Sequence, residues 1–108
     1  MAQNFRRYTS NAAGTSPVTL FTADSYDTVV GISVSNITTN TIFVDVYIND
    51  ATNDIYLVKD APIPAGSALQ VLDGGAKFVV QSGDALKVVS DTASSADIWV
   101  STVDDIST

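Results

Sequence analysis

One unit recurs through the second half of the chain: a short apolar run rich in β-branched residues, closed by a turn that contains Pro, Gly or Asp. The runs cover residues 55–59, 69–72, 78–80, 86–89 and 98–103, and the turns cover residues 62–66, 73–75, 82–84 and 91–95. Short runs with such regular turn signals predict antiparallel strands. The pattern therefore limits the chain to a compact all-β fold.

The first half of the sequence predicts three more strands. In two of them, the alternation of apolar residues indicates which face of the strand packs against the core. A first strand is expected over residues 18–22, and the next two alternate as in a sheet with one face against a core. The covered faces are assigned to Val30, Ile32 and Val34 in one strand and to Ile42, Val44, Val46 and Ile48 in the other. Phe43 and Tyr47 then lie exposed on the outer face, which favours contact with another subunit. Cover by a loop or by the N-terminal segment is the alternative.

About eight strands are too many for one flat sheet in a chain of this length. We predict a single antiparallel β-sandwich of jelly-roll or Greek-key type, with a small barrel as the second choice. In the later runs the core positions are assigned to Leu69, Val71, Leu86, Val88, Ile98 and Val100. Trp99 is expected to point outward, because neighbouring residues of a strand face opposite sides.

Composition agrees with a β fold and narrows the function. All twelve acidic residues are Asp, and Val, Ile and Thr make up 34 of the 108 residues, so we expect little or no helix. The formal charge of −7 disfavours binding to nucleic acid or anionic lipid. No apolar run approaches the roughly 20 residues of a membrane span, and no secretory signal is visible. We therefore expect a soluble protein made in a cytoplasm.

Residues 1–16 differ from the rest of the chain. They hold two of the five basic residues, Arg6 and Arg7, between Phe5 and Tyr8, and then become polar. They contain too little apolar surface to fold alone, so we expect an extended N-terminal arm and a β-sandwich domain over residues 17–108. The arm is either a frayed terminus or a segment that orders on a neighbouring subunit, with aromatic anchors and Arg–carboxylate pairs. Its deletion is expected to leave a folded domain.

The groups that usually carry chemistry are missing. Without Cys or His the chain has no disulfide, no thiolate ligand and no imidazole base to activate a hydroxyl. The loop over residues 49–54 is rich in side-chain oxygens, which are the ligands that calcium prefers. Its spacing fits no calcium-loop signature, however, and Asx residues are ordinary turn formers. Asp104 and Asp105 would face opposite sides of a strand and form no catalytic dyad. We expect no enzyme, no cofactor, no metal and no catalytic residue.

Three segments carry a resemblance to a known family. Residues 56–75, YLVKDAPIPAGSALQVLDGG, and residues 82–97, SGDALKVVSDTASSAD, resemble small virion structural proteins of tailed bacteriophages, especially those of cyanobacteria. Residues 8–20 are similar to the start of the same proteins, so the resemblance spans nearly the whole chain. It implies a virion component, either a decoration or cement protein on the capsid surface or an accessory protein of the neck, tail or baseplate.

The expected partners follow from this resemblance. They are the major capsid protein or other virion proteins, together with further copies of the chain, for which a trimer is one form. The residues assigned to partner binding are Phe5, Arg6, Arg7, Tyr8, Phe43 and Tyr47. A different class stays open: a carbohydrate-binding host-attachment module, in which Tyr47, Tyr56 and Trp99 supply stacking platforms if they share one exposed face.

Overall fold

A computed structural model describes residues 4–23, 27–71 and 78–104, and this part of the chain contains nine strands and no helix. The strands are β1 (Asn4–Ala13), β2 (Val18–Thr22), β3 (Asp27–Asn36), β4 (Ile42–Asn49), β5 (Asp54–Ile63), β6 (Ala68–Gln70), β7 (Phe78–Val80), β8 (Ala85–Ser90) and β9 (Ala96–Asp104). The predicted all-β class is confirmed. The predicted turn at residues 73–75 lies outside the described residues.

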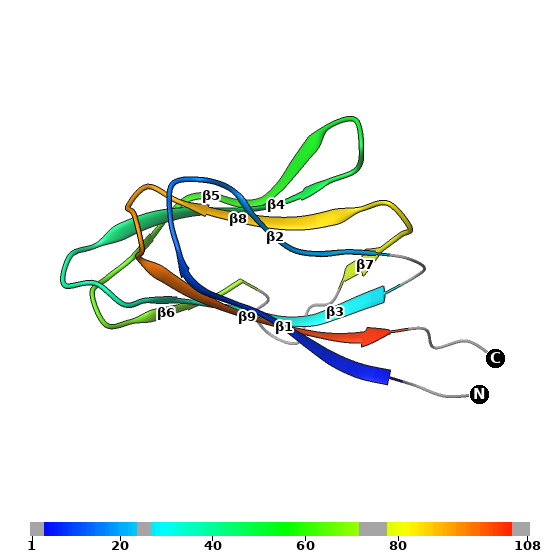
Figure 1. Cartoon of the computed structure of the whole chain (residues 1–108), viewed down its shortest axis with the longest axis horizontal. Helices are drawn as coiled ribbons and strands as arrows, with labels where there is room; N and C mark the ends of the chain where they lie inside the picture. The colour runs from blue at the N-terminus through cyan, green and yellow to red at the C-terminus, as the bar shows by residue number, and fades with distance from the viewer. Residues whose placement is uncertain (1–3, 24–26, 72–77, 105–108) are drawn as a thin grey trace.

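Two antiparallel sheets pack face to face (Figure 1). Sheet A has the order β1-β9-β3-β6, with β7 also paired to β3, and sheet B has the order β2-β8-β4-β5. Strand β1 pairs with β9, β2 with β8, β3 with β6 and β7, and β4 with β5, which is the pairing of one long hairpin. Because this hairpin is rolled so that its strands alternate between two sheets, the sandwich is a jelly roll.

The core lies between the sheets and is built from the alternating aliphatic residues. The side chains of Val44 and Val46 in β4, Leu86 and Val88 in β8, and Val100 in β9 are fully buried. Burying one such side chain stabilises the fold by about 1.5–3 kcal/mol. Leu69 and Val71 are partly buried and pack against this cluster. The period-2 pattern therefore predicted most of the core.

Strand β3 departs from strict alternation. Val29, not Val30, joins the core: Val29 is fully buried, whereas Val30 is 36% exposed. The pairing of β3 with β9 shifts register between Val29 and Gly31. Such a bulge turns the residues on one side of it to the other face. The assignment of Val30 to the covered face was wrong for this reason.

The expected N-terminal arm is instead an edge strand of sheet A. Strand β1 pairs with β9 from the Asn4–Asp104 pair to the Ser10–Ile98 pair. Tyr8 points inward and stacks on Phe21 of β2, with ring centroids 4.5 Å apart. A polar segment cannot fold alone, but an edge strand needs to cover only one face and gains backbone hydrogen bonds from its neighbour. The sandwich therefore includes residues that the sequence assigned to the arm.

The turn predicted over residues 62–66 is shorter than expected. Strand β5 continues through Pro62 to Ile63, and the turn closes with the Ser67 amide donating to the Pro64 carbonyl at 3.1 Å. Pro62 is tolerated because β5 is an edge strand, where a missing N–H interrupts no ladder on the free side. The turns at residues 82–84 and 91–95 lie where the sequence predicted them.

Candidate interaction surfaces

The outer face of sheet B carries an aromatic surface, which we call the sheet B patch: Phe43, Tyr47, Tyr56 and Pro62. In the register of β4 and β5, Phe43 lies opposite Pro62 and Tyr47 lies opposite Tyr56, so all four share the face that points away from the core. Phe43 is 43% exposed and Tyr56 is 41% exposed. The predicted outward position of Phe43 is confirmed.

Tyr47 lies on this face but is not accessible. Its side chain is only 6% exposed, because the Tyr56 ring lies over it with centroids 5.0 Å apart. The Lys59 ammonium in turn lies 4.7 Å from the Tyr56 ring centroid. Burial, followed by the nearby Asp54 charge, raises the pKa of Tyr47. The expected exposure of Tyr47 was wrong, because the cross-strand partner that covers it belongs to the next strand.

Charged residues hold the edge of this patch in place. Asp45 lies 3.6 Å from the Lys59 ammonium and accepts a hydrogen bond from the Asp60 amide at 2.7 Å. Asp60 has a φ of 53°, the left-handed conformation found at bulges. The Asp45 charge raises the pKa of Lys59. These contacts anchor strand β5 to β4 at the point where its backbone is irregular.

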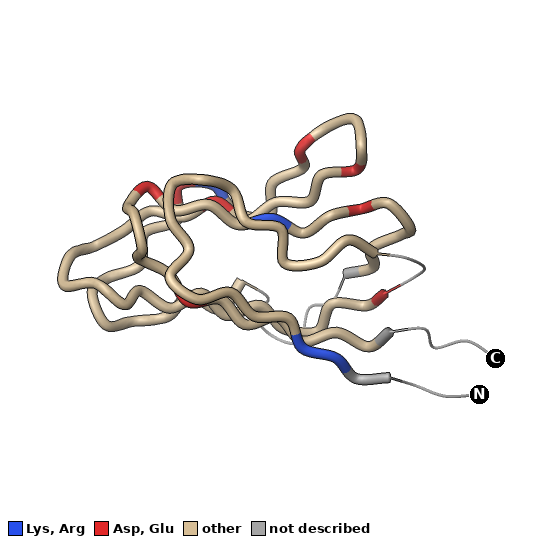
Figure 2. Tube along the Cα trace, in the orientation of Figure 1, with Lys and Arg blue, Asp and Glu red and all other residues tan. Residues whose placement is uncertain are grey.

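The β4–β5 hairpin extends beyond the sandwich, with acidic residues near its end (Figures 1 and 2). The Asp50 carboxylate accepts hydrogen bonds from the amides of Thr52 at 3.0 Å and Asn53 at 2.7 Å, and these bonds lower the pKa of Asp50. Asn49 donates to Asp54 at 2.6 Å. The carboxylate oxygens of Asp50 and Asp54, which the sequence offered as calcium ligands, thus accept hydrogen bonds within the turn itself.

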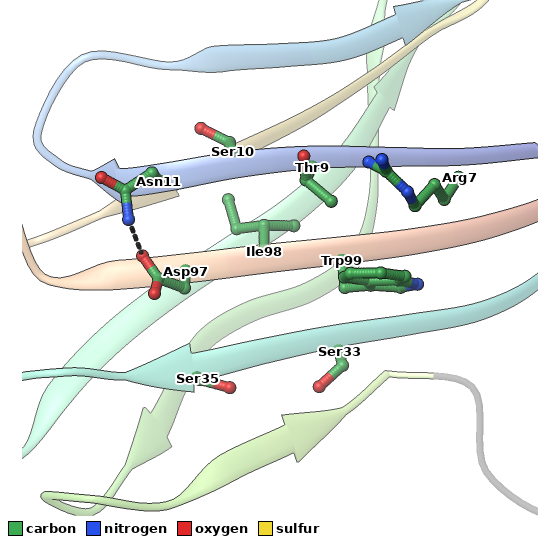
Figure 3. Close-up of a pocket in the computed structure, with 9 residues that line it drawn as sticks. All are labelled: Arg7, Thr9, Ser10, Asn11, Ser33, Ser35, Asp97, Ile98 and Trp99. Atoms are coloured by element: carbon green, nitrogen blue, oxygen red, sulfur yellow. Dashed lines mark hydrogen bonds between the residues drawn. The ribbon is translucent and has the colours of Figure 1, made fainter.

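The outer face of sheet A carries an open depression of about 510 Å³, which we call the Trp99 groove (Figure 3). It runs across β1, β9 and β3. Its lining residues are Arg7, Thr9, Ser10, Asn11, Ser33, Ser35, Asp97, Ile98 and Trp99. Trp99 is 51% exposed, so its predicted outward position is confirmed. The Arg7 guanidinium carbon lies 5.4 Å from the centre of the Trp99 ring.

The six residues assigned to partner binding do not form one surface. Arg7 lies in the Trp99 groove, whereas Tyr8 packs inward on Phe21. Arg6 is exposed and shares the strand face of Tyr8 by alternation, and Phe5 is placed only by its register opposite Val103. Phe43 and Tyr47 lie on the other sheet. The roles of all six residues in partner binding stay predictions. The rings of Tyr8 and Tyr47 already pack against Phe21 and Tyr56 of the same chain.

The three aromatic residues considered as one carbohydrate platform are also separated. Tyr47 and Tyr56 lie on sheet B, and Trp99 lies on sheet A. Sequence reasoning missed the polar side chains that surround Trp99, since they come from three strands that are far apart in the chain. The part of the chain that the structure describes contains no helix that could cross a membrane.

Comparisons with known proteins identify the fold but no family. No protein-family model matches the chain, and no curated protein matches its sequence. One similar solved structure comes from Bacillus endospore appendages, described as a novel family of disulfide-linked pili, with a TM-score of 0.54, 15% identity, and coverage of 94% of this chain and 84% of that chain. The Drosophila NLP-core, described in terms of pentamer formation and histone binding, has a TM-score of 0.54, 14% identity, and coverage of 94% and 98%. At these identities the likeness shows a shared β-sandwich fold alone.

Proposed function

We propose that this chain is a non-enzymatic structural subunit of a phage particle, namely a decoration protein of the head, and that it contacts its neighbours through the sheet B patch. The observation that carries the proposed interface is the pair of exposed aromatic side chains, Phe43 and Tyr56, on the outer face of a sheet edge. Aromatic side chains of this kind are the usual anchors of protein interfaces.

The geometry of β5 supports a protein partner. Among the described strands it is an edge strand of ten residues, and it continues onto the hairpin that leaves the sandwich. A free edge also offers backbone groups that a partner strand can pair with. A standard interface needs about 800 Å² from each partner, with an apolar centre that excludes water. The sheet B patch supplies such a centre.

The assignment to a phage particle rests on the sequence resemblance. Jelly rolls are common in viral capsid proteins, and two of the solved structures that share this fold belong to proteins described in terms of pili and of pentamer formation. The lack of His and Cys in the whole sequence supports a role without catalysis. The proposed partner is the major capsid protein, and an accessory protein of the neck, tail or baseplate is the alternative placement.

Such a subunit would act by adding buried contact area between capsid subunits. One modest interface, repeated over many copies, gives a large total stabilisation of a closed shell. The compact jelly roll would serve as a rigid support that presents the aromatic pair in a fixed geometry.

Phe43→Ser combined with Tyr56→Ser is expected to weaken binding to particles that lack this chain by tenfold or more, because interface anchors contribute about 2 kcal/mol each. Binding is measured as copies retained per particle over a range of protein concentrations. The isolated chain should stay folded and lose about 1–3 kcal/mol of stability, because Phe43 is 43% exposed, whereas Tyr56 also packs over Tyr47.

Val79→Ser is the matched control. Val79 is 61% exposed on β7 of sheet A, so the substitution removes an even more accessible apolar side chain away from the sheet B patch. This variant should bind particles like the unaltered chain. Unchanged binding of the double variant, or an equal loss in the control, would contradict the assignment of the interface.

A further inference from the structure

We propose that the Trp99 groove binds an acidic saccharide, with a sugar ring stacked on the indole of Trp99 and a sugar carboxylate paired with Arg7. The groove lies on sheet A, and the proposed protein interface lies on sheet B, so the two sites are independent. The occupant follows from three features of the groove: a cation that has no ion pair among the described residues, an exposed flat aromatic ring, and hydrogen-bonding groups that surround it.

Arg7 is the charged group that selects an anion. Its guanidinium is held over the Trp99 ring at 5.4 Å, and among the described residues it makes no ion pair or hydrogen bond. An arginine presents five N–H donors in a fork that matches a carboxylate. The rest of the chain is strongly acidic, with a net charge of −7, yet none of the described carboxylates pairs with this group. Figure 3 shows Arg7 on β1 next to Trp99 on the paired strand β9.

Trp99 supplies the apolar platform. It lies near the middle of β9, between Thr9 of β1 and Ser33 of β3 in the strand register. These neighbours are small, and the indole remains 51% exposed. Tryptophan combines a large flat apolar surface with little conformational freedom, which suits stacking against the C–H groups of a pyranose.

The surrounding side chains offer both donors and acceptors. Asp97 accepts hydrogen bonds from the Asn11 side chain at 3.0 Å and the Ala12 amide at 2.8 Å, both at Oδ1, so its Oδ2 can accept from a ligand hydroxyl. Ser33 accepts from Gln70 at 3.2 Å and keeps its own hydrogen for donation. Sugar hydroxyls need donors and acceptors in close proximity, as these residues provide.

The composition of the groove favours a saccharide over other ligands. Trp99 is its one large aromatic side chain, whereas the centre of a protein interface is depleted of charge and rich in apolar groups. A single cation on a chain of net charge −7 is too little to hold a nucleic acid. The volume of about 510 Å³ lies in the ordinary range for small-ligand pockets.

The fluorescence of the full chain tests this proposal directly, because Trp99 is the only tryptophan in the sequence. The probes are a galactose trisaccharide in which one unit is replaced by galacturonic acid, so that it carries a single carboxylate, and the neutral galactose trisaccharide with the same linkage. We expect a saturable change in emission with the acidic probe. The neutral probe should bind about tenfold more weakly, because it lacks the one charge-assisted pair with Arg7. Raised salt should weaken only the acidic probe.

Variants assign the effect to the two residues. Arg7→Gln should weaken the acidic probe about tenfold and leave the neutral probe unchanged. Trp99→Ala should abolish binding of both probes. Binding to this variant is measured by calorimetry, because the tryptophan emission is lost. Lys59→Gln removes an exposed cation from sheet B and is the matched control, expected to bind both probes normally. Phe43→Ser with Tyr56→Ser should also bind both, which separates this site from the proposed function.

Three results would overturn the proposal. The first is no saturable response to either probe, and the second is equal affinity for the acidic and the neutral trisaccharide. The third is a change in Trp99 emission that follows protein concentration without sugar, together with a sedimenting dimer that Trp99→Ala disrupts. This last result would assign the groove to a second copy of the chain.

Discussion

A chain that lacks residues 2–16 is expected to lose its cooperative fold. The deletion removes β1, which covers the free edge of β9 and places Tyr8 on Phe21. It also removes Ala13, which is 3% exposed in the core and accepts a hydrogen bond from the Ser95 amide at 2.9 Å. A domain of this size has a free energy of unfolding of only about 5–15 kcal/mol. The loss of an edge strand with its packed aromatic ring is expected to remove most of it.

Near-UV circular dichroism and thermal melting measure this loss. Two point variants in the same strand show its origin: Tyr8→Ala should lower stability by about 2 kcal/mol, or roughly 10 °C in Tm, whereas Thr9→Ala on the outer face should change it by less than about 0.5 kcal/mol. A truncated chain with a native near-UV spectrum and a cooperative melt would contradict the placement of β1 in the sheet. It would restore the interpretation of this segment as a separable arm.

Asn36→Ala is expected to lower stability by about 2–4 kcal/mol, because Asn36 is a buried side chain with hydrogen bonds to three residues. It is 3% exposed, and its amide donates to the carbonyls of Asn40 at 2.7 Å and Ile63 at 2.8 Å. Its oxygen accepts from the amide and the hydroxyl of Thr38, at 2.8 and 2.7 Å. These bonds fasten the end of β3 in sheet A to the end of β5 in sheet B.

Asn36→Asp tests whether the donors matter. This variant keeps the shape and the acceptor oxygen but places a carboxylate against two carbonyl oxygens in a buried position, so it should destabilise the domain at least as much as Asn36→Ala. Thr38→Ala, which removes one hydroxyl at the rim of the same cluster, should cost less than about 1.5 kcal/mol. Urea unfolding at neutral pH measures all three. An Asp variant as stable as the unaltered chain would contradict this bonding pattern.

Much of the fold was predictable from local pattern, and its exceptions have identifiable causes. The aliphatic residues of β4 and β8 lie in the core because alternation in a regular strand dictates it. Val29 and Val30 exchanged roles because one bulge shifts the register, and single-residue bulges leave no clear signal in β-branched sequence. Strand β1 was missed because it is polar, and only its pairing with the distant β9 makes it a strand.

The candidate surfaces show the same division. The outward positions of Phe43 and Trp99 followed from alternation alone, whereas the burial of Tyr47 depends on Tyr56 across the hairpin. The contact between Arg7 and Trp99 depends on β1 pairing with β9, two strands at opposite ends of the chain. Sequence therefore predicts which side chains face outward. It does not predict which of them meet.

The copy number of this chain in purified virions, measured by quantitative mass spectrometry against the major capsid protein, is the most direct test of its proposed role as a decoration protein. We expect about one copy per capsid subunit or per capsid trimer, since a decoration protein follows the symmetry of the shell. A ratio of only a few copies per hundred capsid subunits would move the chain to the neck or tail. Its absence from the particles would contradict the proposal that it is a virion structural subunit.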